Sequence, residues 1–126
     1  MGKKILIIDD DIEMAEIMGE MLKKKDYEVI LAHDGLRAIE KSNQEKIDLI
    51  LLDIRMPFFS GFWFCDAFKQ RPQTKDIPVA VVSALTERED IEKAYSVGAS
   101  AYLKKPFQAK ELLEIVNRLI GKDSSA

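Results

Sequence analysis

Short apolar segments alternate with longer amphipathic segments along the whole chain, and this alternation limits the fold more than any other feature of the sequence. The apolar segments lie at 4–8, 27–32, 48–53, 78–83 and 101–104, and the interior of the third, DLILLD, is wholly apolar. Such a strand is typical of a parallel sheet covered by helices on both faces. We therefore predict an α/β fold with five strand–helix units and an open, five-stranded parallel sheet. A (βα)8 barrel would need about 250 residues.

The segments between the strands have the spacing of apolar residues that is typical of helices. We expect helices at 12–25, 35–43, 62–71, 87–97 and 108–120. The residues expected to face the core from the first two helices are Ile12, Ala15, Met18, Leu22, Leu36, Ile39 and, less clearly, Ala38. Thr86 and Glu89 have the spacing of a capping box, and Gly98 and Gly121 should end the last two helices.

Composition indicates one ordered domain and argues against several functional classes. Of the residues, 47% are hydrophobic and 33% charged, and 19 basic against 22 acidic side chains give a net charge of −3, which disfavours direct binding of nucleic acid. One cysteine forms no internal disulfide, and neither a signal peptide nor an apolar run of about 18 residues is present. We expect a cytoplasmic domain over residues 1–121, without membrane insertion, and a C-terminal tail or the start of a linker at 122–126.

Polar residues suited to metal and phosphate chemistry lie at the ends of the predicted strands. They are Asp9 and Asp10 after the first strand, Asp53 after the third, Ser83 at the end of the fourth and Lys105 after the fifth. Ligands of open parallel sheets bind at this edge. Grouped carboxylates suit Mg²⁺, whereas an ammonium and a hydroxyl donate to phosphoryl oxygens. A single aspartate at such a place usually caps a helix, as we expect of Asp11, but the joint occurrence predicts a site for Mg²⁺ and a phosphoryl group.

At these positions the chain resembles the receiver domain of two-component response regulators, from about Lys3 to Ile120. The resemblance rests on IIDD, LLDIRMP, Gly61, VVSA and GASAYLKKPF, in this order. It implies a single flavodoxin-like (βα)5 domain with helices on both faces of the sheet. It also implies a phosphoacceptor signalling domain rather than an enzyme. The implied partners are a sensor histidine kinase or a histidine phosphotransfer protein, and a downstream protein target or a fused effector.

The resemblance assigns the phosphoryl and metal chemistry to particular residues. Asp53 would accept the phosphoryl group. Asp10 would bind Mg²⁺ directly and Asp9 through water, with Asp53 and the backbone carbonyl of Arg55 as the remaining protein ligands. Lys105 would hold a phosphoryl oxygen, because transfer to a carboxylate requires positioning and neutralisation of the phosphoryl oxygens.

The resemblance also indicates how the signal leaves the site. Ser83 would donate to the phosphoryl group and vacate space into which Tyr102 turns, which changes the face formed by the fourth helix, the fifth strand and the fifth helix. Arg55 and Leu85 occupy positions that tune the lifetime of the phosphoryl group in this family, and we expect slow autodephosphorylation. In this family a cis peptide bond would precede Pro106.

The loop after the phosphoacceptor departs from the family, because it is rich in aromatic residues. The residues of the following helix that should face the core are Phe64, Cys65 and Phe68. Phe58, Phe59 and Trp63 would then form an exposed aromatic patch, a candidate interface for a partner or for a homodimer. Ser60 stands where the family has an acidic residue and can still cap the helix.

Two other functions share parts of this residue pattern with the receiver. A Mg²⁺-dependent hydrolase of the haloacid-dehalogenase type also uses an aspartate at a strand end, but it needs a second acid two residues later, where this chain has Arg55. A receiver-like adaptor that binds constitutively would not need the complete set of acidic, hydroxyl and lysine residues. Either a stand-alone receiver or a piece of a longer protein is compatible with the sequence.

Overall fold

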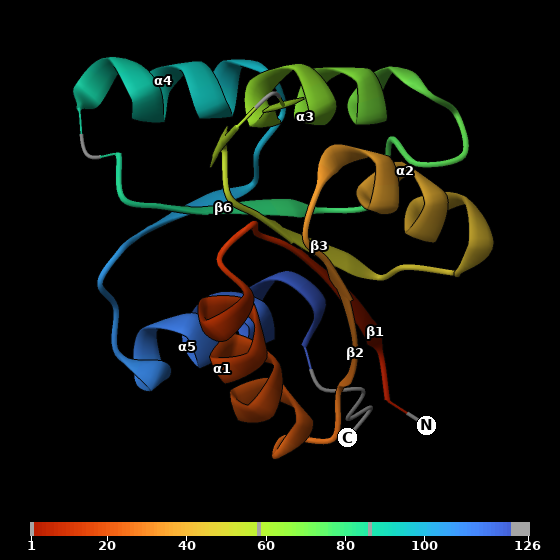
Figure 1. The fold of residues 1–126 in the computed structure, drawn as a ribbon, viewed down its shortest axis with the longest axis vertical. Coiled ribbons are helices and arrows are strands. Elements are labelled where there is room, and N and C mark those ends of the chain that lie inside the picture. The colour runs from red at the N-terminus through yellow and green to blue at the C-terminus, as the bar shows by residue number, and fades with distance from the viewer. Residues whose placement is uncertain (1, 58, 86, 122–126) are drawn as a thin grey trace.

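The computed structural model describes residues 2–57, 59–85 and 87–121, and its centre is a parallel sheet. The strands are β1 (Lys4–Ile8), β2 (Glu28–Ala32), β3 (Leu49–Leu52), β6 (Val79–Ser83) and β7 (Ala101–Lys104). They pair in the order β2-β1-β3-β6-β7, and every pair is parallel (Figure 1). The predicted open, five-stranded parallel sheet is confirmed.

Helices cover both faces of the sheet, also as predicted. They are α1 (Ile12–Lys23), α2 (Gly35–Gln44), α3 (Gly61–Gln70), α4 (Arg88–Ser96) and α5 (Ala109–Ile120). Successive strand residues point to opposite faces, so Ile5 and Ile7 pack with residues of α1 and α5, whereas Leu6 and Ile8 pack with residues of α2, α3 and α4. None of the described helices is long and apolar enough to cross a membrane.

Local signals in the sequence set several helix ends. The side chains of Asp11, Asp34 and Ser60 accept hydrogen bonds from the backbone N–H three residues later and so cap α1, α2 and α3. Gly98 follows α4 with φ of 108°, a conformation that favours glycine. The capping box predicted at Thr86 falls on a residue outside the described ranges.

The inward face of α2 differs from the prediction. Leu36 is 65% exposed and Ile39 is 37% exposed, whereas Gly35 and Ala38 are buried. Both pairs of residues have helical spacing, but the small pair allows α2 to lie close to the sheet. The expectation for Ile12 was also wrong, since it is 52% exposed at the first position of α1, while the other three predicted residues of that helix are buried.

The segment after β3, predicted as a loop, contains a short antiparallel hairpin of β4 (Arg55–Met56) and β5 (Phe59–Ser60). Its base is closed by Gly61, the first residue of α3. A Cβ atom at Gly61 would lie 2.4 Å from the Cα atom of Ile54. Only glycine permits this approach, so the hairpin returns the chain directly against the residue that follows Asp53.

Candidate functional site

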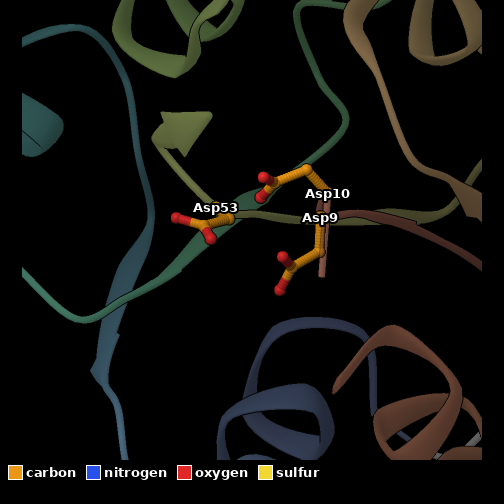
Figure 2. Close-up of side chains that lie close together, drawn as sticks. All are labelled: Asp9, Asp10 and Asp53. Atoms are coloured by element: carbon orange, nitrogen blue, oxygen red, sulfur yellow. The ribbon is translucent and has the colours of Figure 1, made fainter. Parts of the chain in front are cut away.

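Three carboxylates gather at the carboxyl edge of the sheet. Asp9 and Asp10 follow β1, and Asp53 follows the neighbouring strand β3 (Figure 2). Each residue offers an oxygen within 4.8 Å of the oxygens offered by the other two. Asp9 and Asp53 are buried, whereas Asp10 is exposed. The cluster is thus anchored on one side and open to solvent on the other.

Hydrogen bonds hold the two buried carboxylates in place. Oδ1 of Asp9 accepts from the backbone N–H of Asp11 at 2.9 Å, and Oδ1 of Asp53 accepts from that of Arg55 at 2.9 Å. The Lys105 ammonium donates to Oδ2 of Asp9 at 2.9 Å and to Oδ2 of Asp53 at 3.2 Å. Both side chains are therefore oriented by the backbone, with the second oxygen of each directed to one shared cation.

The electrostatics of the cluster leave an excess of negative charge. Burial raises the pKa of Asp53 above its ordinary value, although the Arg55 amide and the Lys105 charge oppose this shift. Burial lowers the pKa of Lys105, but its bonds and charge interactions with Asp9 and Asp53 outweigh burial, and the net shift is upward. The formal charges of the three carboxylates and the one ammonium sum to −2, and a group of carboxylate oxygens with this formal charge fits a hard divalent cation.

Ser83 ends β6, which lies between β3 and β7 in the sheet. Its buried hydroxyl accepts from the backbone N–H of Leu85 at 3.2 Å, and the carbonyl of Leu85 accepts from the Tyr102 hydroxyl at 2.8 Å. The backbone of Leu85 therefore joins the two residues predicted to form the switch. Sequence reasoning identified Leu85 only through its side chain, because no sequence signal marks a backbone group that bridges two strands.

The structure thus brings together the predicted residues from four strand ends. Asp9 and Asp53 contact Lys105 directly, Asp10 lies within the same group of carboxylates, and Ser83 lies at the same edge of the sheet. Arg55 has an exposed side chain, and Leu85 is half-buried. The cis peptide bond before Pro106 is present.

The predicted aromatic patch is smaller than expected. Phe59 is half-buried, with its ring centroid 5.6 Å from that of Phe64, and a Cβ atom at Gly35 would lie 2.2 Å from its ring. The prediction that Phe59 is exposed was wrong, because the hairpin folds its ring over the start of α2. Trp63 is 59% exposed, as predicted, and Phe58 lies outside the described residues. Phe64, Cys65 and Phe68 are buried, as predicted.

The chain is similar in sequence to a known protein family and to several of its members. Residues 5–117 match the response regulator receiver domain family. The master transcriptional regulator RpaA of Synechocystis sp. is 36% identical over 117 residues, which cover 93% of this chain and 48% of the relative. The phosphate regulon regulator PhoB of Escherichia coli is 32% identical over 124 residues, which cover 98% of this chain and 54% of the relative. The chain spans about half the length of these curated relatives.

Solved structures have the same fold. The chemotaxis protein CheY4 of Vibrio cholerae is similar with a TM-score of 0.89 and 32% identity, over 94% of this chain and 99% of that chain. A putative response regulator from Chloroflexus aurantiacus is similar with a TM-score of 0.90 and 29% identity, over 95% and 98% of the two chains. From its sequence and its fold, this chain belongs to the response regulator receiver domain family of two-component signalling.

Proposed function

We propose that Asp53 accepts a phosphoryl group from a phosphohistidine on a sensor kinase or on a histidine phosphotransfer protein. An Asp53 oxygen attacks the phosphorus, a P–O bond forms, and the P–N bond breaks with its electron pair left on the imidazole nitrogen. The observation that supports this role is the placement of the Asp53 oxygens within 4.8 Å of two further carboxylates and 3.2 Å from the Lys105 ammonium. Lys105 would neutralise a phosphoryl oxygen as charge moves onto it.

We further propose that Asp9, Asp10 and Asp53 hold Mg²⁺, with the backbone carbonyl of Arg55. The negative excess of the cluster and its oxygen donors support this cation. Bound Mg²⁺ would neutralise phosphoryl oxygens beside Asp53. Asp9 and Asp53 are already oriented by backbone amides, so the chain itself positions two of the three carboxylates.

The signal would leave the site through Leu85. When the Ser83 hydroxyl turns toward a phosphoryl group on Asp53, it would give up the hydrogen bond that it accepts from the Leu85 N–H. Because the carbonyl of Leu85 accepts from the Tyr102 hydroxyl, a shift of the Leu85 backbone would also release Tyr102. Tyr102 lies in β7, so the surface made by α4, β7 and α5 would change with it. A downstream protein or a fused effector would bind this surface.

The lifetime of the phosphoryl group would depend on Arg55 and Leu85. The long, exposed side chain of Arg55 and the half-buried side chain of Leu85 would restrict the approach of water to the acyl phosphate, and slow autodephosphorylation is expected. The decay of phosphorylated protein, followed by intact mass, should be faster in Arg55→Asn and in Leu85→Ala. An unchanged half-life in both variants would contradict this role.

A hydrolase that turns over its substrate is less well supported. The position two residues after Asp53, where such an enzyme needs its proton donor, holds Arg55, and the Arg55 side chain is exposed. Steady hydrolysis of a phosphodonor without a protein adduct would favour the hydrolase over the receiver.

The first test is intact-protein mass after incubation with Mg²⁺ and acetyl phosphate. One phosphoryl group should be added to the wild type and none to Asp53→Asn. Asp34→Asn is the matched control, because Asp34 caps α2, is not one of the three clustered carboxylates, and asparagine also caps a helix. An adduct in Asp53→Asn, or an unmodified wild type with intact donor, would refute the assignment of Asp53 for this donor.

A second test addresses the metal without relying on phosphorylation. Mg²⁺ should raise the thermal unfolding midpoint of the wild type, because a ligand that binds only the native state stabilises it. Asp10→Asn should lose most of this rise. Asp11→Asn, which alters the neighbouring helix cap instead, should keep it. Equal responses of the two variants would count against a metal site at Asp10.

A third test addresses the output surface. Hydrogen exchange of the phosphorylated and unmodified protein should differ in α4, β7 and α5 more than in α1. Tyr102→Phe should reduce the difference, since it removes the hydroxyl that bonds to Leu85. A change confined to residues next to Asp53 would refute this path.

A further inference from the structure

The His33 side chain, directly after β2, contacts the backbone of the carboxylate cluster. Its Nδ1 atom lies 3.3 Å from the carbonyl oxygen of Asp9. A carbonyl oxygen can only accept a hydrogen bond, so the ring donates through Nδ1–H. His33 is half-buried, and none of the roles proposed above for the metal, the phosphoryl group or the switch uses it. The contact joins the turn after β2 to the peptide group that leads into Asp10.

The His33 ring takes the place of a backbone donor in the parallel ladder of β1 and β2. Ile8 is in register with Ala32, and the N–H of Asp9 donates to the Ala32 carbonyl at 3.1 Å. In this register the next donor, to the carbonyl of Asp9, would be the backbone N–H of Asp34. Asp34 caps α2 instead, and the His33 ring donates to this carbonyl. A side chain thus extends the pairing of the two strands by one bond.

Asp10 depends on this bond more than the other two carboxylates do. The side chains of Asp9 and Asp53 each accept from a backbone amide and from the Lys105 ammonium. Within the part of the chain that the structure describes, no hydrogen bond holds the carboxylate of Asp10, which is exposed. The direction of the Asp10 side chain is therefore set by the two peptide groups beside it.

Each of these two peptide groups is held by one hydrogen bond. The N–H of the following peptide, which belongs to Asp11, donates to Oδ1 of Asp9 at 2.9 Å. The carbonyl of the preceding peptide, which belongs to Asp9, accepts from His33. Figure 2 shows that the Asp10 side chain then extends toward Asp53. Without the His33 donor, the preceding peptide group would be free to rotate, and the Asp10 side chain would turn with it.

The turn that carries His33 is itself anchored. The side chain of Asp34 accepts from the N–H of Arg37 at 2.8 Å. The next residue, Gly35, is buried under the Phe59 ring, where an added Cβ atom would lie 2.2 Å from that ring. The turn is thus held against the β4–β5 hairpin, which follows Asp53. A ring on a backbone held in this way can orient the peptide group that it contacts.

We propose that His33 is a positioning residue for the Mg²⁺ site, because its Nδ1–H holds the Asp9 carbonyl so that Asp10 directs its carboxylate into the cluster. This inference rests on the Mg²⁺ site proposed above. Loss of a hydrogen bond that orients a metal ligand typically weakens metal binding by about 10- to 100-fold. His33 acts on Asp10 through the backbone, so we expect the lower end of this range.

The tautomer of the His33 ring tests the hydrogen bond without a metal and without a variant. A long-range proton–nitrogen NMR spectrum of the metal-free wild type distinguishes the two tautomers, and His33 is the chain's only histidine, so the assignment is direct. The neutral ring should carry its proton on Nδ1, because the partner of that atom is a carbonyl oxygen. A proton on Nε2 would overturn the proposal, since Nδ1 would then have no hydrogen to donate.

Titration of the full chain with Mg²⁺, followed by the amide NMR signals, tests the effect on the metal. His33→Leu, which lacks a donor, should raise the dissociation constant of Mg²⁺ about tenfold. His33→Asn is the matched control and should keep the wild-type constant, because its side-chain nitrogen is bonded to Cγ as Nδ1 is. Circular dichroism would verify that both variants fold.

The outcomes separate the role of His33 from the metal site itself. Wild-type affinity in His33→Leu, or equal losses of affinity in His33→Leu and His33→Asn, would overturn the proposal while Asp10→Asn still loses Mg²⁺ binding. A wild type that does not bind Mg²⁺, or an Asp10→Asn protein that binds it as tightly as the wild type, would refute the metal site and the role of His33 with it.

Discussion

Gly61 provides a sharp test of how the hairpin holds the phosphorylation loop. Exchanging glycine for alanine in a helix normally stabilises it by up to about 1 kcal/mol. At Gly61 the added Cβ atom would lie 2.4 Å from the Cα atom of Ile54 and 2.8 Å from its Cγ2 atom. The first of these contacts is with backbone, so a change of rotamer cannot relieve it.

The expected cost follows from how firmly Ile54 is held. Its side chain is 5% exposed, its carbonyl accepts from the N–H of Gly61 at 3.4 Å, and the N–H of the preceding residue, Asp53, donates to the Ile8 carbonyl at 2.9 Å. Overpacking of this kind costs about 1–3 kcal/mol or more. We therefore expect Gly61→Ala to lower the free energy of unfolding by about 1–3 kcal/mol and to slow modification of Asp53 by acetyl phosphate.

Urea denaturation followed by circular dichroism measures the change. Gly19→Ala in α1 is the matched control, because its added Cβ atom would lie 3.4 Å from Val29 Cγ1, an ordinary contact. It should raise the free energy of unfolding by about 0.4–1 kcal/mol. A Gly61→Ala protein as stable as the wild type, or two variants that shift in the same direction, would refute the reasoning.

Three further predictions concern single side chains. Asp53→Asn should unfold at a higher temperature than the wild type at neutral pH, because burial disfavours the ionised carboxylate of Asp53. This gain in unfolding temperature should shrink as the pH falls through the raised pKa of Asp53, because the wild-type carboxyl then becomes neutral as well. A gain that does not change with pH would contradict the prediction. Tyr102→Phe should lower the free energy of unfolding by about 1 kcal/mol, because the hydrogen bond to the Leu85 carbonyl is lost. Urea denaturation measures this change, and an unaltered free energy of unfolding would refute the prediction. Burial raises the pKa of Cys65 to about 11. A thiol reagent at mildly alkaline pH should therefore label Cys65 only as fast as the protein unfolds locally around it. Labelling as rapid as that of a free thiol would contradict the prediction.

The sequence by itself determined the strands of the parallel sheet, the helices between them, and which residues lie at the strand ends, although it did not indicate the hairpin of β4 and β5. Runs of apolar residues identified the five strands of the sheet, and short polar side chains such as Asp34 and Ser60 marked helix starts that the structure confirms. The residues at the strand ends followed from the same pattern, because parallel strands bring their carboxyl ends to one edge. Periodicity and capping depend on neighbours in the chain, and for that reason they can be recognised without a structure.

The tertiary structure decided which of several equivalent local patterns is buried. In α2 the pair Gly35 and Ala38 has the same spacing as Leu36 and Ile39, and only close packing on the sheet and under Phe59 selects the small pair. The strand order and the bridge through the Leu85 backbone likewise arise from contacts between distant segments. A local pattern specifies that a helix has an apolar face, but the space left by the remaining chain determines which face packs inward.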